Sequence, residues 1–513
     1  KSLGKFGGDT DNWMWPRHTA DFSMFRVYAG ADNEPAAYSS GNVPYKPKHF
    51  LPVDASGQKE GDYAMIMGYP GRTNRYEVSY GVKLAIDEVN PSIVNIRDKR
   101  LAIMRKHMKG NKATYLKLTS LYSRVANYWK YFIGQTEQLK RLGVVAQKQE
   151  AEDDFAMWAR ERDVKNGDLM DEFETIYEDY TPYAKHVVYY GEAIRASALT
   201  KLAASMEPMY KAMKDGKDQE TISKMAAEME KGLKAFYKEY DAGTEKELFA
   251  EMTKMFYNNV PKAQHPSIYE EIQGKYKGNY AAYTNYVFGK SFMANPAKLK
   301  AFLKAPKMEQ LESDPAFVYA TSFSSNYNGK YKAKVDEFNN TKKDLHRRYI
   351  KALMKMNPGK NYYPDANSTM RVTYGKVDGY SSSEGRKFNY FTTLDQTVAK
   401  YKPGNEEFDL PKELIALNKK RDYGVWADAD GSLHTCFITD NDITGGNSGS
   451  PVINGNGELI GLAFDGNWEA MSGDIAFDKK YKRTICVDIR FVLFLVEKLG
   501  KAPNIINEME VYK

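Results

Sequence analysis

The feature that most constrains this chain is a change of pattern, from short strands to long helices and back again. Residues 1–80 carry many Gly and Pro residues and short alternating runs, such as Asp21–Tyr28 and Tyr63–Met67, which are typical of strands bounded by turns. Residues 81–365 place apolar side chains at helical spacing, as in Ile222–Tyr240 and Leu248–Phe256. From residue 366 the strand pattern returns, beginning with Met370–Tyr374. We therefore expect a helical block inserted into one β-rich frame.

The C-terminal zone contains the clearest local signals. Ser450–Ile453 and Leu459–Phe464 flank Asn454-Gly455-Asn456-Gly457, which predicts a β-hairpin because Asn and Gly tolerate positive φ. The run Asp488–Leu499 opens with an N-capping residue type and ends before a glycine, so it predicts a terminal helix. At 513 residues the chain is too long for one core. We expect three parts, over residues 1–80, 81–365 and 366–513, in an α+β multidomain protein.

The composition argues against several classes of site. The 74 basic and 67 acidic residues give a net charge of only +7, and Lys and Glu are interleaved, so we expect solvated helix faces and no nucleic-acid partner. No apolar run approaches the ~18 residues of a membrane span. The only cysteines, Cys436 and Cys486, exclude a disulfide scaffold. We expect them to be buried thiols, with a single bridge as the alternative, and we expect no metal and no cofactor.

The sharpest chemical motif is Gly445-Gly446-Asn447-Ser448-Gly449-Ser450-Pro451. Glycines around Ser448 permit a tight turn that exposes the hydroxyl and directs neighbouring N–H groups to one point, an oxyanion hole for acyl transfer. The alternative is a Gly/Asn/Ser turn without chemistry. The hairpin that follows favours the nucleophile, because in chymotrypsin-like proteins such a loop precedes the strands that line the specificity pocket.

A second piece of a catalytic triad lies far upstream, where Asp21 opens the alternating run Asp21–Tyr28. A partly buried carboxylate in this context orients an imidazole and stabilises its cation, and the order Asp21 then Ser448 fits a His-Asp-Ser arrangement. A plain strand-edge Asp is the alternative. The seven histidines do not supply the base: His18 is three residues from Asp21 and is interpreted as structural, and His434 as core or pocket wall. We expect the base upstream of Lys1.

Four stretches carry a family resemblance. They are Gly7–Ser23 (GGDTDNWMWPRHTADFS), Met67–Thr73 (MGYPGRT), Asn127–Lys130 (NYWK) and Gly446–Pro451 (GNSGSP). Together they resemble the bacterial dipeptidyl-peptidase 7 and 11 family, essentially from end to end. The resemblance implies a chymotrypsin-like double β-barrel, its first barrel incomplete in this chain, with an inserted helical cap. It also implies cleavage of dipeptides from free N-termini of peptides, a homodimer, and a location in the periplasm or at the cell surface of a Gram-negative bacterium.

The same resemblance implies a role for individual residues. Asp21 is the triad acid and Ser448 the nucleophile, with the N–H groups of Gly446 and Ser448 as the oxyanion hole. The implied substrate-binding positions are Asn12, Trp13, Asn127 and Asp465, which match the residues that hold the free α-amine, together with Phe464 and Gly466. An ammonium needs a carboxylate and carbonyl-type acceptors, because burying it unpaired is costly. A fixed distance between this clamp and the nucleophile would place two substrate residues between the free amine and the bond that is cut.

Substrate preference should depend on Gly466. Family members selective for Asp or Glu at the second substrate residue carry an Arg at this position, which pairs with an acidic side chain. With Gly here, and Phe464 as a wall, we expect a preference for hydrophobic side chains, as in the dipeptidyl-peptidase 7 branch. Asp442 is a competing clue: it lies six residues before Ser448, where trypsin-like enzymes hold a carboxylate that selects Lys or Arg. A structural hydrogen-bond network is the other interpretation of Asp442.

Three alternatives stay open at this point. One is a catalytically inactive, peptide-binding relic of a protease, and a second is a trypsin-like endopeptidase. The third treats the helical zone as an independent interaction domain, although no exposed apolar stripe supports it.

Overall fold

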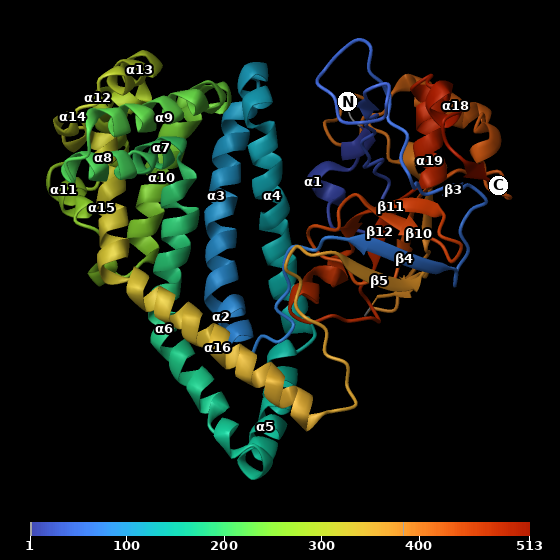
Figure 1. The fold of residues 1–513 in the computed structure, drawn as a ribbon, viewed down its shortest axis with the longest axis horizontal. Helices are drawn as coiled ribbons and strands as arrows, with labels where there is room; N and C mark the ends of the chain where they lie inside the picture. Colours follow the sequence, from blue (N-terminus) through green and yellow to red (C-terminus); the bar gives the residue numbers. More distant parts are fainter. Residues whose placement is uncertain (1–2, 383) are drawn as a thin grey trace. The chain divides into compact units, whose positions relative to one another are not determined.

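The computed structural model describes residues 3–382 and 384–513, which form two compact units. Unit 1 combines residues 1–76 with 363–513, and unit 2 is the intervening Glu77–Tyr362. Unit 2 is helical and unit 1 holds the strands (Figure 1). The helical block thus interrupts the β-rich part of the sequence, as the change of pattern predicts.

Unit 1 is built on a sheet of nine strands, seven of which follow the order β5-β4-β10-β11-β12-β9-β8, while β3 pairs with β11 and β13. The strands of this sheet are β3 (Val53–Asp54), β4 (Tyr63–Gly68), β5 (Arg371–Lys376), β8 (Phe391–Thr393), β9 (His434–Thr439), β10 (Ser450–Ile453), β11 (Leu459–Gly466), β12 (Thr484–Asp488) and β13 (Val511–Tyr512). Two short pairs lie outside it, namely β1 (Tyr28–Ala29) with β2 (Val43–Pro44) and β6 (Tyr380–Ser381) with β7 (Lys387–Phe388).

The two segments of unit 1 share this sheet. Strand β4, from the first segment, pairs antiparallel with β5 and β10 from the second, and lies between them in Figure 1. Its alternate residues Ala64 and Ile66 are fully buried, which explains the alternation seen in the sequence. The predicted hairpin is confirmed: β10 and β11 pair antiparallel around residues 454–457. Cys436 and Cys486, on β9 and β12, are buried free thiols, as expected.

The predicted strand over Asp21–Tyr28 is wrong. Residues 21–27 form no strand, and the only pairing here joins β1 to β2. Alternating apolar side chains make a strand only where a neighbouring strand supplies hydrogen bonds and a face to pack on. Among the described residues this segment has no such neighbour, and the Phe25 side chain is 89% exposed.

The helix predicted at residues 488–499 is confirmed, with one change. Asp488 is its N-cap and accepts a hydrogen bond from the Arg490 N–H. Helix α19 (Ile489–Phe494) continues as a π-helix over Leu495–Leu499, and Phe491 and Leu493 are buried in a core that also contains Val487 of β12. It is not the last element, because α20 (Pro503–Ile506) and β13 follow. Unit 1 also contains α1 (Gly8–Asp11), α17 (Leu394–Ala399) and α18 (Lys412–Lys420).

Unit 2 is a helical domain with a large aromatic and aliphatic core. Its α-helices are α2 (Ser79–Leu84), α3 (Asn90–Met108), α4 (Lys112–Arg141), α5 (Val144–Arg162), α6 (Leu169–Glu192), α7 (Ala198–Ser205), α8 (Glu207–Lys214), α9 (Gln219–Glu239), α10 (Ala242–Asn259), α11 (Ile268–Gly274), α12 (Tyr280–Lys290), α13 (Pro296–Lys304), α14 (Met308–Glu312), α15 (Pro315–Lys330) and α16 (Lys332–Met356). The stripes read from the sequence belong to α9 and α10, and Met252 and Phe256 of α10 are buried in this core.

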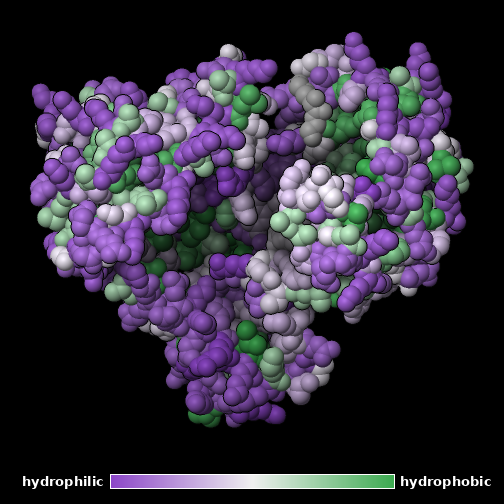
Figure 2. Space-filling model, turned by 45° about the horizontal axis from the view of Figure 1, so that its top comes forward, coloured by the Kyte–Doolittle hydropathy of each residue, from purple (hydrophilic) through white to green (hydrophobic). Residues whose placement is uncertain are grey.

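The surface agrees with the interleaved charges of the sequence. On the face shown in Figure 2, hydrophilic side chains predominate and hydrophobic ones form scattered groups. Among the described residues, none of the helices combines the length and the apolar character needed to cross a membrane. The fold is therefore a mixed one, a helical unit together with antiparallel sheets.

Candidate active site

The nucleophile candidate lies on a tight loop between β9 and β10. Ser448 is exposed, whereas its neighbour Asn447 is 2% exposed. The buried Asn447 side chain organises the turn, because its Oδ1 accepts a hydrogen bond from the Thr444 N–H at 3.2 Å. A rigid turn with one exposed hydroxyl at its tip is the arrangement that the loop sequence predicts.

Two glycines are required by the packing around this loop. Gly446 has φ +108°, and a Cβ there would lie 2.4 Å from the Tyr69 carbonyl oxygen. A Cβ on Gly68 would lie 2.5 Å from the Asn447 amide nitrogen. The segment after β4 is also bonded to the loop, because the Gly71 N–H donates to the Gly445 carbonyl at 2.7 Å. The motif at residues 67–73 thus buttresses the nucleophile loop, although the two are distant in sequence.

The backbone amides of the loop fall into two groups. Those of Asn447, Gly449 and Ser450 donate to carbonyl oxygens of the protein. Within the described part of the chain, those of Gly446 and Ser448 have no acceptor. Two unused N–H groups that flank the nucleophile are what an oxyanion hole requires, since they stay available for a substrate oxygen.

Strand β11 brings one of the predicted substrate-binding residues, Phe464, next to Ser448. The Ser448 Oγ lies 3.4 Å from the Phe464 carbonyl oxygen, and the Gly449 N–H donates to the Ala463 carbonyl at 2.7 Å. The register of β11 against β12 shifts between Ala463 and Asp465, so that Phe464 is an extra residue on the strand. Bulges of this kind re-aim side chains beside active sites.

Asp465 is buried and bound on both oxygens. Its Oδ2 accepts hydrogen bonds from Arg17 Nη1 at 2.6 Å and from the Trp13 N–H at 3.1 Å. Its Oδ1 accepts one from the Gly466 N–H at 2.9 Å. Sequence reasoning named Asp465, Trp13 and Gly466 but missed Arg17, whose side chain pairs with a carboxylate 448 residues away. No signal in the sequence connected Arg17 to Asp465, and the acid at helical spacing from Arg17 is Asp21.

Asp21 belongs to the same electrostatic environment. Desolvation raises the pKa of its carboxyl group, while the cations Arg17 and Lys5 oppose this shift and the Asp465 charge adds to it. Asp21 therefore lies near enough to Arg17 and Asp465 to interact with both charges. Its contact with a catalytic histidine stays a prediction.

The two histidines weighed against the triad role are engaged elsewhere. His18 is buried beside Thr397, with 3.4 Å between its Nδ1 and the Thr397 Oγ1, and burial together with Lys400 and Arg17 lowers its pKa to about 3. His434 is buried on β9, stacks on Phe391 at 3.8 Å between ring centroids, and lies close to Arg490. Both are structural, and neither hydrogen-bonds Ser448 among the described residues.

Gly466 lies in a narrow place at the end of β11. A Cβ there would be 3.1 Å from the Ala470 Cβ and 3.7 Å from the Trp13 ring. The other predicted wall, Phe464, is half-buried, with the Arg17 guanidinium 5.2 Å from its ring centroid. The small residue thus leaves space beside two aromatic rings and contributes no charge.

Asp442 takes the structural role that was one of its two interpretations. Its Oδ1 accepts hydrogen bonds from Arg75 at 2.9 Å and from Lys482 at 2.7 Å. Burial alone raises the pKa of this carboxyl group, but Lys482 and Arg75 bring it below its usual range. The ammonium of Lys482 is itself buried and also donates to the Ile443 carbonyl at 2.7 Å. A basic substrate side chain has no unshared charge to bind here.

The remaining predicted clamp residues lie on two units. Asn12 is half-buried at the C-cap of α1, directly before Trp13, which has a φ of 59°. Asn127 is half-buried on α4 of unit 2. Asn12 therefore shares unit 1 with Asp465, and the role of Asn127 in the same clamp stays a prediction.

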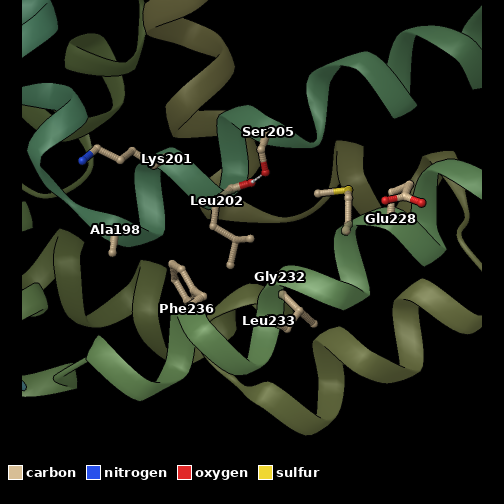
Figure 3. Close-up of a pocket in the computed structure, with 9 residues that line it drawn as sticks. Ala198, Lys201, Leu202, Ser205, Glu228, Gly232, Leu233 and Phe236 are labelled. Atoms are coloured by element: carbon tan, nitrogen blue, oxygen red, sulfur yellow. Dashed lines mark hydrogen bonds between the residues drawn. The ribbon is translucent and has the colours of Figure 1, made fainter. Parts of the chain in front are cut away.

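The cavity between α7 and α9 of unit 2 is a different kind of site. It has a volume of about 450 Å³, and its lining includes Leu202, Leu233 and Phe236. Figure 3 shows Leu202 and Phe236 pointing toward one another between the two helices. The Ser205 hydroxyl at its edge donates to the Leu202 carbonyl at 2.6 Å, so it is not poised as a nucleophile.

Comparison with known proteins places this geometry in context. A family model described as Peptidase S46 matches residues 1–511. A dipeptidyl-peptidase 7 of Porphyromonas endodontalis is 40% identical, with 100% of this chain and 62% of the relative covered. An Asp/Glu-specific dipeptidyl-peptidase of Flavobacterium psychrophilum is 38% identical, with 99% and 71% covered. The chain thus spans less than two thirds of the first relative and about 71% of the second.

A solved structure agrees with the sequence comparison. The crystal structure of Porphyromonas endodontalis DPP11 in complex with the dipeptide Arg-Glu matches with a TM-score of 0.90 at 31% identity. The match covers 99% of this chain and 73% of that one. The similarity therefore includes both units and the loop that carries Ser448.

Proposed function

The chain belongs to the peptidase S46 family, and from this premise we propose that the whole protein is a serine dipeptidyl-peptidase that releases dipeptides from peptides with a free α-amine. The family assignment confirms the resemblance seen in the motifs. One observation carries the proposal: the exposed Ser448 hydroxyl lies 3.4 Å from the carbonyl of Phe464, the residue that directly precedes the buried Asp465 carboxylate. The nucleophile loop thus contacts the strand that carries an anion for the chain end.

In this proposal each residue has a defined role. Ser448 attacks the carbonyl carbon of the second substrate residue and gives its proton to a histidine that Asp21 orients. The N–H groups of Gly446 and Ser448 bind the oxyanion of the tetrahedral intermediate. The histidine returns the proton to the leaving amine, and a water molecule then hydrolyses the acyl-enzyme. The base is a residue outside this sequence.

The free α-amine is recognised by a clamp in which Asp465 supplies the charge. Asn12 supplies an amide oxygen, and Trp13 covers the site. A buried ammonium needs such partners on all of its N–H groups. An ordinary endopeptidase has no use for this arrangement, and the two internal cations on Asp442 also disfavour trypsin-like selection.

At the second substrate residue we propose a preference for hydrophobic side chains. Gly466 supplies no cation for an acidic side chain, and Phe464 and Trp13 offer apolar surface beside it. The names of the relatives include both the general and the Asp/Glu-specific kind. The uncharged position 466 favours the former.

The resemblance also supports three statements about the whole protein. They are a chymotrypsin-like double β-barrel with an inserted helical domain, a homodimer, and a location in the periplasm or at the surface of a Gram-negative cell. The antiparallel sheet of unit 1 is compatible with the second barrel. Light scattering of the purified protein tests the dimer, and cell fractionation tests the location.

Substitution of the nucleophile tests the proposal. In the protein with all the residues that its gene encodes, Ser448→Ala should lower kcat on a dipeptidyl reporter by about 10⁵-fold or more. The melting temperature should stay unchanged, because Ser448 is exposed and makes only a long hydrogen bond. Ser450→Ala, two residues further on at the start of β10, is the control and should retain turnover. Activity that survives Ser448→Ala would refute the assignment.

A further inference from the structure

Arg17 is a buried cation at the centre of the candidate site. Its side chain is 8% exposed, and Nη1 donates to Asp465 Oδ2 at 2.6 Å and to the Asp11 carbonyl at 3.1 Å. Nε donates to the Thr19 hydroxyl at 2.6 Å, and the guanidinium covers the Phe464 ring. These contacts fix the guanidinium from several directions, since its donors have a rigid planar geometry.

The hydrogen bonds of Asp465 show what this fixation achieves. A carboxylate offers about four acceptor positions, two on each oxygen. On Oδ2, Arg17 and the Trp13 N–H occupy both, and on Oδ1 the Gly466 N–H occupies one. Among the described residues, one acceptor position on Oδ1 is left over. An incoming ammonium therefore has a single place to donate, and Arg17 sets its direction by holding Oδ2.

Arg17 also separates two negative charges. Its cation acts on Asp21 as well as on Asp465, and the Asp465 charge acts on Asp21 in the opposite sense. Without Arg17, two carboxylates would share one partly desolvated region, which disfavours ionisation of one of them. The charged groups that act on Asp21 are Arg17, Asp465 and Lys5.

We propose that Arg17 is a positioning residue for both halves of the site: it orients Asp465 toward the substrate ammonium and keeps the Asp465 charge from acting unopposed on Asp21. This inference rests on the proposed function, because it assigns Arg17 to the amine clamp and the triad acid of that activity. Arg17 itself contacts neither the scissile carbonyl nor the nucleophile in this scheme.

The test compares two substitutions of Arg17 in the full protein. Arg17→Gln keeps a donor but removes the charge, and it should raise KM for a free-amine dipeptidyl reporter on the order of 100-fold, with a smaller effect on kcat, because a misplaced clamp costs about this much. Arg17→Lys keeps the charge and should recover most of the loss in KM. Arg490→Gln is the matched control, since it removes another buried arginine that pairs with an aspartate, Asp488, in unit 1.

A pH profile supplies a readout that a merely structural role would not move. Activity on the reporter falls at low pH when the Asp21–histidine pair takes up a proton, and this limb belongs to both groups together. Loss of the Arg17 cation raises the pKa of that pair, so in Arg17→Gln the acid limb should move to higher pH. In Arg17→Lys and in Arg490→Gln it should stay in place.

The outcomes separate the two proposals. Wild-type KM and an unmoved acid limb in Arg17→Gln would overturn the role of Arg17 while leaving the proposed function intact, provided that Ser448→Ala is inactive. A wild-type protein that does not cleave the reporter would instead refute the function. An equal rise of KM in Arg490→Gln would also overturn the inference, because the effect would then be general destabilisation.

If Arg17→Gln gives no folded protein, Thr19→Val takes its place. This substitution is nearly isosteric and removes the acceptor of Arg17 Nε, together with the hydrogen bond that the Thr19 hydroxyl donates to the Phe6 carbonyl at 2.8 Å. It should raise KM by about 10-fold, because the guanidinium keeps its charge but loses one of its fixed directions. An unchanged KM in a folded Thr19→Val protein would contradict the positioning role.

Discussion

Two carboxylates near the nucleophile loop differ in the internal cations that are paired with them. Asp442, six residues before Ser448, accepts two internal cations, Arg75 and Lys482, on one oxygen. Asp465, at the end of β11, accepts one cation, Arg17, and two backbone amides. Asp442 is thus paired with two internal cations, whereas Asp465 is paired with one. The number of internal cations, rather than distance from the serine in sequence, decides which carboxylate can bind a substrate cation.

The strongest test of this difference removes the charge of Asp465. Asp465→Asn should raise KM for free-amine substrates by about 30-fold or more, because loss of one member of a buried, hydrogen-bonded charge pair costs 2–5 kcal/mol or more. Steady-state kinetics on a dipeptidyl reporter measures it. An unchanged KM would mean that the ammonium is held elsewhere and that the two carboxylates do not differ in function.

The matching substitution at Asp442 should lower the stability of the protein rather than weaken substrate binding. Asp442→Asn leaves the buried Lys482 and Arg75 without their carboxylate, and should lower the free energy of unfolding by about 3 kcal/mol. KM for the same reporter should change little in the fraction that stays folded. Chemical denaturation and kinetics on one preparation measure both quantities. A large rise in KM with normal stability would reverse the comparison.

Gly466→Arg should sharpen the comparison by adding a cation beside Asp465. The new side chain should shift the ratio of kcat/KM for acidic over hydrophobic second residues by about 10-fold, since an arginine can pair with a carboxylate in two places. The contact of a Cβ with Ala470 at 3.1 Å requires a small local adjustment. Gly466→Gln, of similar length and without charge, is the control. No shift in Gly466→Arg would place specificity at other residues.

The smallest expected effect comes from an exposed cation near the triad acid. Lys5 lowers the pKa of Asp21 against the larger effect of desolvation, so Lys5→Gln should move the acid limb of the pH profile slightly upward. Because Lys5 is exposed, the difference should vanish at about 1 M salt, where the screening length is ~3 Å. A shift that persists at high salt would point to a structural change rather than to charge.

Local elements were predictable from the sequence, and long-range pairs were not. The β10–β11 hairpin and the Asp488 N-cap depend on residues within a few positions, so their signals survive in the sequence. The Arg17–Asp465 pair joins residues 448 positions apart, and only the fold brings them together. The failed strand at Asp21–Tyr28 has the same cause, because a strand depends on a neighbour that its own sequence does not specify.

The same reasoning explains the candidate site. Ser448 and the glycines around it were evident because a tight turn has a local composition. Asp442 had two interpretations until its partners Arg75 and Lys482 were located, and both lie more than 30 residues away in the sequence. A buried charge requires a partner, but the sequence does not show which residue that partner is.

One measurement tests the central claim most directly. The claim is that a buried anion binds the free amine of the substrate at a distance of two substrate residues from the nucleophile. The whole protein is given a dipeptidyl reporter with a free α-amine and the same reporter with an acetylated amine. Acetylation removes the positive charge and two of the three N–H donors while the scissile bond stays the same. The account predicts rapid cleavage of the free-amine reporter and no measurable cleavage of the acetylated one. Equal cleavage of both would contradict it.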